Sequence, residues 1–204
     1  MKTIHVLTNA QLEEQEAEFT ALLKGTKRKG AASMLSWLKQ ETDFFTAPAS
    51  TRGHGNFEGG LVVHSINVYK LLKSFAKKIE NLSEDSLVIV GLLHDVCKAN
   101  FYKQTVKNVK VPGEKRWEEE IGYMIDDAFP LGHGEKSLFL VQRHIELKDD
   151  EAMAIRWHMS GYDDAARGYA GGMAQSAAYE KYPLAAATAI ADMYTTYFLD
   201  KKNA

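Results

Sequence analysis

Histidine and aspartate side chains in separate apolar stretches constrain this chain more than any other feature of its sequence. They are His64, the adjacent pair His94 and Asp95, then His133, His158 and Asp192. Burying an unpaired carboxylate beside an imidazole is costly, and a cation is an efficient partner for it. Groups so far apart in sequence can share a cation only if several elements carry them to a common centre. The sequence therefore predicts a fold built around a buried polar site.

The stretches that carry these side chains have helical patterns. Over residues 58–80, apolar residues recur at helical spacing and share the face of His64. The His-Asp pair lies near the end of the apolar run 87–98, and Asp192 is the one charged residue of the segment 185–199. We therefore expect these side chains to point into the protein.

Each residue also has a simpler explanation when it is taken singly. A histidine on an apolar helix face is commonly a core residue that bonds to backbone groups, and this explanation stays open for His64. Asp95 could cap a neighbouring element or pair with an arginine. Asp192 could form a buried salt bridge, and its candidate partners are Arg143, Arg156 and Lys98. These single explanations leave the coincidence of several such residues unexplained.

The rest of the chain is also predicted to be mainly helical. The expected helices cover residues 9–24, 31–41, 58–80, 84–98, 135–146, 149–159, 172–181 and 183–200. Gly161 is expected to end the helix before it. Two strand-like runs around a Pro112-Gly113 turn predict a small β-hairpin at about 105–125, which we expect to cover one edge of the site. The predicted fold class is all-α with this hairpin as an excursion.

Composition agrees with one enzyme-sized domain. The 204 residues, 45% of them hydrophobic, can bury a substantial core. We expect a single domain over 1–204, in which N-terminal helices over 1–45 pack on a metal-binding core over 46–200. The net charge of -2 argues against extended nucleic acid as an obligatory ligand. One cysteine and no membrane-length apolar run predict a cytoplasmic protein without membrane contact.

Five short motifs resemble the HD-domain superfamily of metal-dependent phosphohydrolases. They are GGLVVHS (59–65), GLLHDVCK (91–98), GHGEKS (132–137), AIRWHM (154–159) and AIADMY (189–194). The third and fourth resemble the intervening histidines of the subgroup that holds two metal ions, and the likeness runs over 45–199. One departure is the pair Val96 and Cys97, where many relatives carry a smaller or glycine-containing pair. We expect these two side chains to pack rather than to bind metal.

The resemblance implies an HD-domain helical bundle with six metal ligands. His64, His94, Asp95 and Asp192 would bind the first ion, and His133 and His158 would bind a second ion, with Asp95 bridging the two. Mixed imidazole and carboxylate ligands that leave open positions suit a catalytic divalent site. The ligand types admit iron, manganese, nickel, cobalt or zinc, whereas magnesium is less suited to so many imidazoles.

A pair of such ions implies hydrolysis. Two cations can hold a bridging hydroxide and stabilise the attacking and leaving oxygens of a phosphoryl displacement. The expected substrate is a phosphate ester or anhydride, most simply a nucleotide. One alternative is a 3'-to-5' exoribonuclease-like phosphodiesterase that acts on short single-stranded RNA or DNA. Another is a non-catalytic module that binds metal and senses a nucleotide.

Four further residues are candidates for contact with the substrate. Lys98 follows His94 by four residues, so on a continuous helix its ammonium could reach a phosphate oxygen beside catalytic Asp95. Favourable placement at a helix C-terminus is the alternative explanation of this lysine. The other three candidates, in two glycine-rich loops, are Arg52, His54 and Arg167. Either loop could equally be an ordinary connector.

Overall fold

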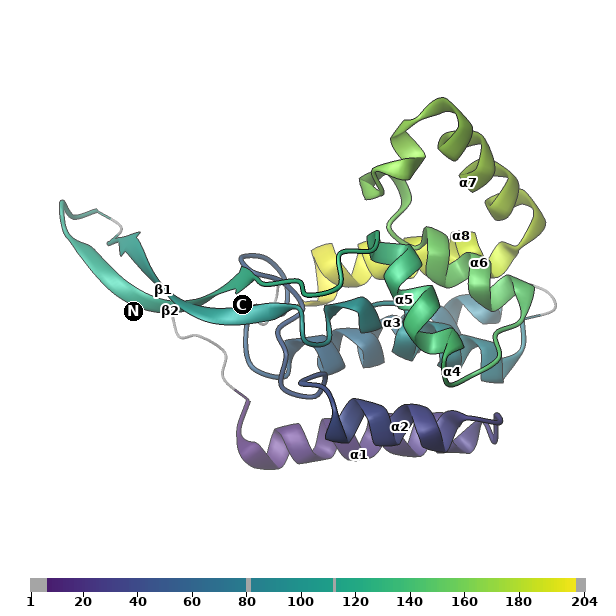
Figure 1. Ribbon diagram of the computed structural model, residues 1–204, viewed down its shortest axis with the longest axis horizontal. Helices are drawn as coiled ribbons and strands as arrows, with labels where there is room; N and C mark the ends of the chain where they lie inside the picture. The colour runs from purple at the N-terminus through teal and green to yellow at the C-terminus, as the bar shows by residue number, and fades with distance from the viewer. Residues whose placement is uncertain (1–6, 80–81, 112, 201–204) are drawn as a thin grey trace.

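The computed structural model describes residues 7–79, 82–111 and 113–200, and in these the chain forms a helical bundle with one hairpin (Figure 1). The α-helices are α1 (Asn9–Gly25), α2 (Ala31–Gln40), α3 (Gly60–Ala76), α4 (Glu84–Leu93), α5 (His133–Gln142), α6 (Asp149–Trp157), α7 (Tyr169–Lys181) and α8 (Pro183–Tyr194). The strands are β1 (Tyr102–Lys110) and β2 (Trp117–Ile125). The predicted all-α fold with a small hairpin is confirmed.

Helices α3 and α4 form the centre of the bundle. Helices α1 and α2 lie on one side of them, and α6 and α8 lie on the other (Figure 1). The two central helices approach closely at Gly91, where a Cβ atom would lie only 2.6 Å from the Cα of Tyr69. One continuous hydrophobic core includes Phe19 of α1, Met34 of α2 and Leu184 of α8. The proposed boundary near residue 45 stays a prediction, because both sides of it contribute to this core.

A buried ion pair ties the segment between α1 and α2 to α6. Arg28 Nη1 lies 2.5 Å from Oε1 of Glu151, whose side chain is 0% exposed. The hydroxyl of Ser86 in α4 donates to the same oxygen over 2.7 Å. Burial raises the pKa of Glu151, but the hydrogen bonds from Arg28, the Lys148 backbone and Ser86, with the charge of Arg28, together outweigh it, and the net pKa is lowered. The carboxylate therefore stays charged inside the core and depends on its partners.

The helix that carries the His-Asp pair is shorter than predicted. Helix α4 ends at Leu93, Asp95 leaves the helical conformation with φ -103° and ψ 17°, and the chain continues as a 3₁₀ turn, Val96–Lys98. His94 and Lys98 therefore do not share the continuous helical face expected over 84–98. A similar change follows α8, where residues Thr195–Leu199 form a π-helical turn.

The hairpin is present and slightly longer than predicted. Strands β1 and β2 pair antiparallel from Tyr102↔Ile125 to Lys110↔Trp117. Gly113 has φ +82° in the turn, whereas Pro112 lies outside the described residues. The hairpin projects away from the helices (Figure 1). Among the described residues, neither strand lines the cavity beside the His-Asp cluster. At the base of the hairpin, however, the charges of Lys98 and Asp95 act on Tyr102 of β1. The expected cover over one edge of the site therefore stays a prediction.

Two smaller features complete the fold. After α6 the left-handed residue is Ser160, with φ +50°, so the expected helix stop at Gly161 is displaced by one residue. Within the described ranges, no helix is both long enough and apolar enough to cross a membrane.

Candidate metal centre

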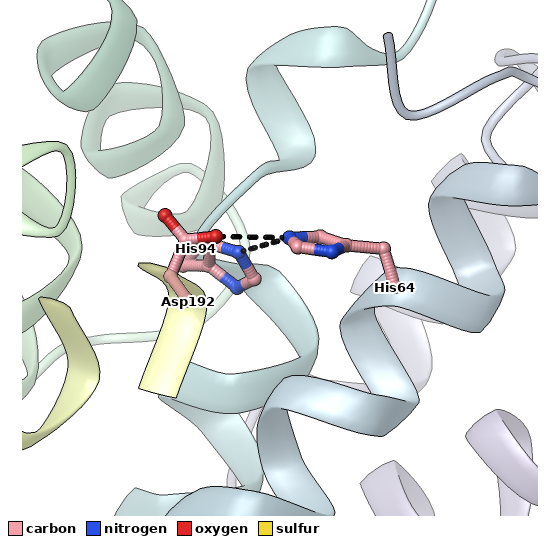
Figure 2. Close-up of side chains that lie close together, drawn as sticks. All are labelled: His64, His94 and Asp192. Carbon is pink, nitrogen blue, oxygen red and sulfur yellow. Dashed lines mark hydrogen bonds and ion pairs between the residues drawn. The ribbon is translucent and has the colours of Figure 1, made fainter. Parts of the chain in front are cut away.

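The bundle brings the six predicted side chains together. His64 comes from the middle of α3, His94 and Asp95 follow α4, His133 begins α5, His158 follows α6, and Asp192 lies in α8. Figure 2 shows His64 facing both His94 and Asp192. The Nε2 atom of His64 lies 3.4 Å from Nε2 of His94 and 3.1 Å from Oδ1 of Asp192. Side chains from separate helices thus converge on one buried point.

The separations in this first group fit a shared cation. Bonds of about 2.0–2.2 Å in tetrahedral geometry place two nitrogen or oxygen ligands about 3.4 Å apart. The Oδ2 atom of Asp95 lies 3.6 Å from Nε2 of His64 and 3.7 Å from Nε2 of His94. Together with Asp192, these atoms could hold one ion with small adjustments.

Asp95 connects this first group to a second one. Its other oxygen, Oδ1, lies 2.7 Å from Nε2 of His133 and 3.5 Å from Nε2 of His158. The two oxygens of one carboxylate therefore face two different pairs of histidines. A carboxylate that binds one ion through each oxygen requires this arrangement.

Hydrogen bonds to backbone carbonyl groups fix the orientation of two imidazoles. The Nδ1–H groups of His94 and His158 donate to the carbonyl oxygens of Gly91 (3.0 Å) and Ile155 (2.7 Å). Donation through Nδ1 leaves the lone pair on Nε2, which is how metal-binding histidines are commonly oriented. The Nε2 of His158 is buried and makes no hydrogen bond within the described part of the chain. This nitrogen is therefore available to a cation.

His64 is oriented by a carboxylate that sequence analysis missed. Its Nδ1–H donates over 2.7 Å to Oδ2 of Asp200, and the side-chain amide of Asn67 donates to the other oxygen over 2.9 Å. Asp200 is 3% exposed. The available signal was an acidic residue two helical turns beyond Asp192.

Replacing Asp200 with asparagine is expected to weaken metal binding about 10- to 100-fold, because loss of such an orienting partner has this effect at other metal sites. Competition with a chelating indicator dye would measure the affinity. Asp126→Asn is the matched control, since Asp126 is 65% exposed and its ion pair with Lys103 is long, at 4.0 Å. Equal affinities for the Asp200 variant and the wild type would contradict the orienting role.

The centre concentrates charge in a mostly buried setting. Burial raises the pKa of Asp95, but nearby Lys98 and the histidines outweigh it and hold that pKa well below its usual value. Burial lowers the pKa of His94 to about 3, so this ring is neutral at pH 7. Burial acts in the same direction on His64, yet hydrogen bonds to Asp192 and Asp200 raise its pKa to about 9. The carboxylates thus remain ionised, as cation ligands must, and His64 would lose its added proton when a cation binds.

The alternative ion pairs proposed for Asp192 are not formed. Arg156 pairs with Glu135 at 2.5 Å and with Asp163 at 2.6 Å. Arg143 stacks over the ring of Phe139 at 4.4 Å from its centroid. Lys98 pairs with Asp95 instead, with Nζ 2.6 Å from Oδ2. Asp192 instead contacts His64 at 3.1 Å and accepts a hydrogen bond from the hydroxyl of Thr196 over 3.4 Å.

A cavity of about 260 Å³ opens beside the cluster. Its lining consists of His54, Lys98, His133, His158, Met159, Tyr162, Ala189, Asp192, Met193, Thr196 and Tyr197. Two of the four residues predicted to contact the substrate, His54 and Lys98, are in this lining. The ring of His54 lies 4.9 Å from that of His64, and burial lowers its pKa to about 4. His54 is therefore a neutral group beside the predicted ligands.

The other two predicted contacts lie elsewhere. Arg52 lines a separate cavity between its loop and the hairpin. Arg167 is 64% exposed and pairs with Asp164 at 3.2 Å on the surface. Loop composition alone could not distinguish these arginines from His54, because the direction of each loop depends on tertiary packing. Neither arginine lines the cavity beside the His-Asp cluster.

Cys97 lies beside one of the predicted metal ligands. Its Sγ lies 3.4 Å from both ring nitrogens of His133. The sequence predicted that this side chain packs and does not bind metal, and it did not predict the contact with His133.

A buried set of imidazoles and carboxylates between the helices is an arrangement that suits a divalent metal ion. The family model described as "HD domain" matches residues 61–196, and the chain belongs to this family. HD domains are metal-dependent phosphohydrolases that bind divalent metals. The resemblance to the HD-domain superfamily is confirmed, whereas membership of the subgroup that holds two metal ions stays a prediction.

Two curated relatives match a shorter stretch. The 3'-5' exoribonuclease YhaM of Bacillus subtilis (strain 168) is 35% identical over 60 residues, which cover 29% of this chain and 19% of the relative. The 3'-5' exoribonuclease YhaM of Geobacillus sp. (strain WCH70) is 35% identical over 60 residues, or 29% of this chain and 18% of that protein. The match thus spans less than a fifth of the length of either relative. No solved structure matches the chain.

Proposed function

We propose that this protein is a phosphohydrolase with two metal ions that cleaves a phosphate ester or anhydride bond of a nucleotide. The observation that most supports two ions is the division of the Asp95 oxygens, with Oδ2 near His64 and His94 and Oδ1 near His133 and His158. The proposed first ion would be held by the first pair of histidines, Asp95 and Asp192. The second would be held by the second pair and the same Asp95.

Divalent transition metals fit these ligands best, since each ion would receive two imidazoles and at least one carboxylate. When bound, such a pair would activate water and stabilise charge on the attacking and leaving oxygens of a phosphoryl group. The protein's own contribution is to hold the ligands in a mostly buried setting, where electrostatic interactions are stronger than in water.

Lys98 has the position of a phosphate contact. Its ammonium lines the cavity, and the side chain is only 11% exposed. One N–H group donates to Asp95 over 2.6 Å. An ammonium has three donors, so the others can reach a phosphate oxygen that enters the cavity. Lys98 would then neutralise negative charge on both Asp95 and the phosphate group of the substrate.

The residues that line the cavity favour a nucleotide as the substrate over a phosphate compound without a base. The hydroxyl groups of Tyr162 and Tyr197 lie 3.0 Å apart, and the thioether side chains of Met159 and Met193 are in the same lining. Aromatic rings and thioethers give a base a surface to stack on. The volume of about 260 Å³ suits one nucleotide unit better than a duplex. We therefore favour a small nucleotide.

A 3'-to-5' exoribonuclease-like phosphodiesterase is the second candidate. The 35% identity to the two exoribonucleases over 60 residues favours it. The net charge of -2 does not favour binding of a long strand, which requires an extended basic surface. A short single strand whose terminal nucleotide enters the cavity would satisfy both observations.

Turnover on a substrate panel tests this proposal. Metal-loaded protein is expected to hydrolyse at least one nucleotide among mononucleotides, dinucleotides and short oligoribonucleotides. Faster cleavage of oligoribonucleotides from their 3' ends would support the phosphodiesterase alternative. Nucleotide binding with no turnover of any substrate would contradict the enzyme and support the sensing module.

The contribution of the base is tested by Tyr162→Ala. The KM for the best nucleotide is expected to rise about tenfold, because stacking on an aromatic side chain contributes about 1–3 kcal/mol per base. The KM for p-nitrophenyl phosphate, which lacks a base, should change much less. Tyr169→Ala is the matched control, because Tyr169 is 87% exposed and lies outside this cavity. Equal losses on both substrates would contradict a base contact at Tyr162.

A further inference from the structure

A sulfur atom lies among the ligands proposed for the second ion, Asp95, His133 and His158. The HD-domain motifs do not include this sulfur as a ligand. The Sγ of Cys97, a carboxylate oxygen of Asp95 and a ring nitrogen of His133 all lie within 4.8 Å of one another. Cys97 is 2% exposed, so its thiol faces this group and not the solvent. Three different ligand atoms thus surround one small volume.

The distances suit coordination. A divalent ion such as zinc binds sulfur at about 2.3 Å and imidazole nitrogen at about 2.0–2.1 Å, which separates the two atoms by about 3.6 Å in tetrahedral geometry. The observed separation between Sγ of Cys97 and the ring nitrogens of His133 is 3.4 Å. A hydrogen bond between thiol and imidazole is the alternative explanation of the same contact.

Because α4 ends early, the sulfur of Cys97 lies on the same side of the chain as Asp95. In a continuous helix, successive residues turn by about 100°, so Cys97 would point away from Asp95, two residues before it. The break at Asp95 and the 3₁₀ turn that follows bring both side chains to the same group. The backbone N–H of Cys97 donates to the hydroxyl of Ser137 in α5 over 3.1 Å. This bond fixes the turn against the helix that begins with His133.

An independent observation points to a cation at the same place. His158 is 1% exposed, and its Nε2 makes no hydrogen bond to any described residue. This nitrogen lies 3.5 Å from Oδ1 of Asp95, and the His158 ring centroid is 5.1 Å from that of His133. Buried nitrogen acceptors without a partner are uncommon in folded proteins. A cation shared with Asp95 and His133 would satisfy it.

We propose that Cys97 binds the second ion as a thiolate, together with Asp95, His133 and His158. This inference rests on the two-ion site of the proposed function. As the sulfur–metal bond forms, the thiol releases its proton to solvent. Thiolate ligands favour zinc, cobalt or iron over manganese and magnesium. The second position would therefore select a softer ion than a site of histidines and carboxylates alone.

Titration of the metal-free protein with Co²⁺ tests this proposal without any turnover assay. Because the chain has one cysteine, a thiolate-to-cobalt charge-transfer band in the near ultraviolet can be assigned to Cys97. The band is expected to reach full intensity at two equivalents of Co²⁺. X-ray absorption should then show one sulfur neighbour at about 2.3 Å from part of the cobalt.

Cys97→Ser and Cys97→Ala provide the controls. Both are expected to lose the band and to bind the second Co²⁺ at least about tenfold more weakly, with circular dichroism reporting whether each variant folds. Two bound Co²⁺ ions in the wild type without the band would overturn the thiolate ligand and leave the proposed hydrolase intact. Failure of the wild type to bind any Co²⁺ would overturn both.

Discussion

Replacing Asp95 with asparagine is expected to lower kcat on the best substrate by at least about a thousandfold, which corresponds to about 4 kcal/mol. Asparagine keeps the shape of the side chain and removes the charge. Its amide nitrogen cannot act as the second ligand oxygen, so one side of the proposed bridge is lost. Lys98, now 2.6 Å from Oδ2, would also face an uncharged group. Steady-state kinetics on metal-loaded protein would measure the effect.

The matched control for this variant is Asp164→Asn. The side chain of Asp164 is 94% exposed, and within the described part of the chain its ion-pair partner is the surface residue Arg167. Its replacement should leave kcat within about twofold of the wild type, since exposed ion pairs have small effects. An Asp95→Asn protein that is folded, binds two ions and retains the wild-type rate would refute the bridging role.

Replacing Arg28 with alanine is expected to lower the free energy of unfolding by about 3 kcal/mol, because it leaves a buried charge without its partner. The charge is that of Glu151, which is 0% exposed and 2.5 Å from Arg28. Chemical denaturation at pH 7 would measure the loss. Lys39→Ala is the matched control, since the Lys39–Glu16 pair is similarly short at 2.6 Å but its side chains are 37% and 40% exposed. It should cost less than about 1 kcal/mol.

The dependence of this effect on pH follows from the lowered pKa of Glu151. A carboxylate with a lowered pKa stabilises the fold above its ordinary pKa, and this stabilisation is lost as pH falls through the lowered value. The difference between the wild type and Arg28→Ala should therefore shrink in acid, where Glu151 becomes neutral. A difference no larger than that of Lys39→Ala at pH 7 would show that the buried pair is dispensable.

Sequence reasoning predicted the helices and the six converging side chains for one physical reason. Charged or imidazole groups on apolar helix faces need a partner, and His64 and Asp192 lacked an obvious one within their own segments. In the structure they contact each other at 3.1 Å, and His64 also bonds to Asp200 at 2.7 Å. Periodicity showed which way each side chain points, and the motifs showed which residues belong together. Their roles as metal ligands stay a proposal.

Other features depend on tertiary structure that no local pattern reveals. The break after Leu93 was hidden, because Val96, Cys97 and Lys98 would be acceptable in a longer helix. Lys98 was predicted to contact the substrate because it follows His94 by four residues, a spacing that places both on one face only in a continuous helix. In the structure, Lys98 reaches Asp95 through a 3₁₀ turn instead. The same break brought Cys97 to His133.

Loops and chain ends were predicted least well. Arg52 and His54 belong to one loop, and only His54 lines the cavity beside the cluster. Asp200 contacts His64 because the π-helical turn Thr195–Leu199 shifts the helical register after α8. Such a shift alters which residues share a face, and its cause lies in packing and not in composition.

The number of transition-metal ions per chain is the most direct test of the central claim that these side chains form a metal centre. Elemental analysis by mass spectrometry, after reconstitution and removal of free metal, is expected to give two ions per wild-type chain. Replacing both His133 and His158 with alanine should reduce the count to one. Less than one ion per folded wild-type chain would contradict the account.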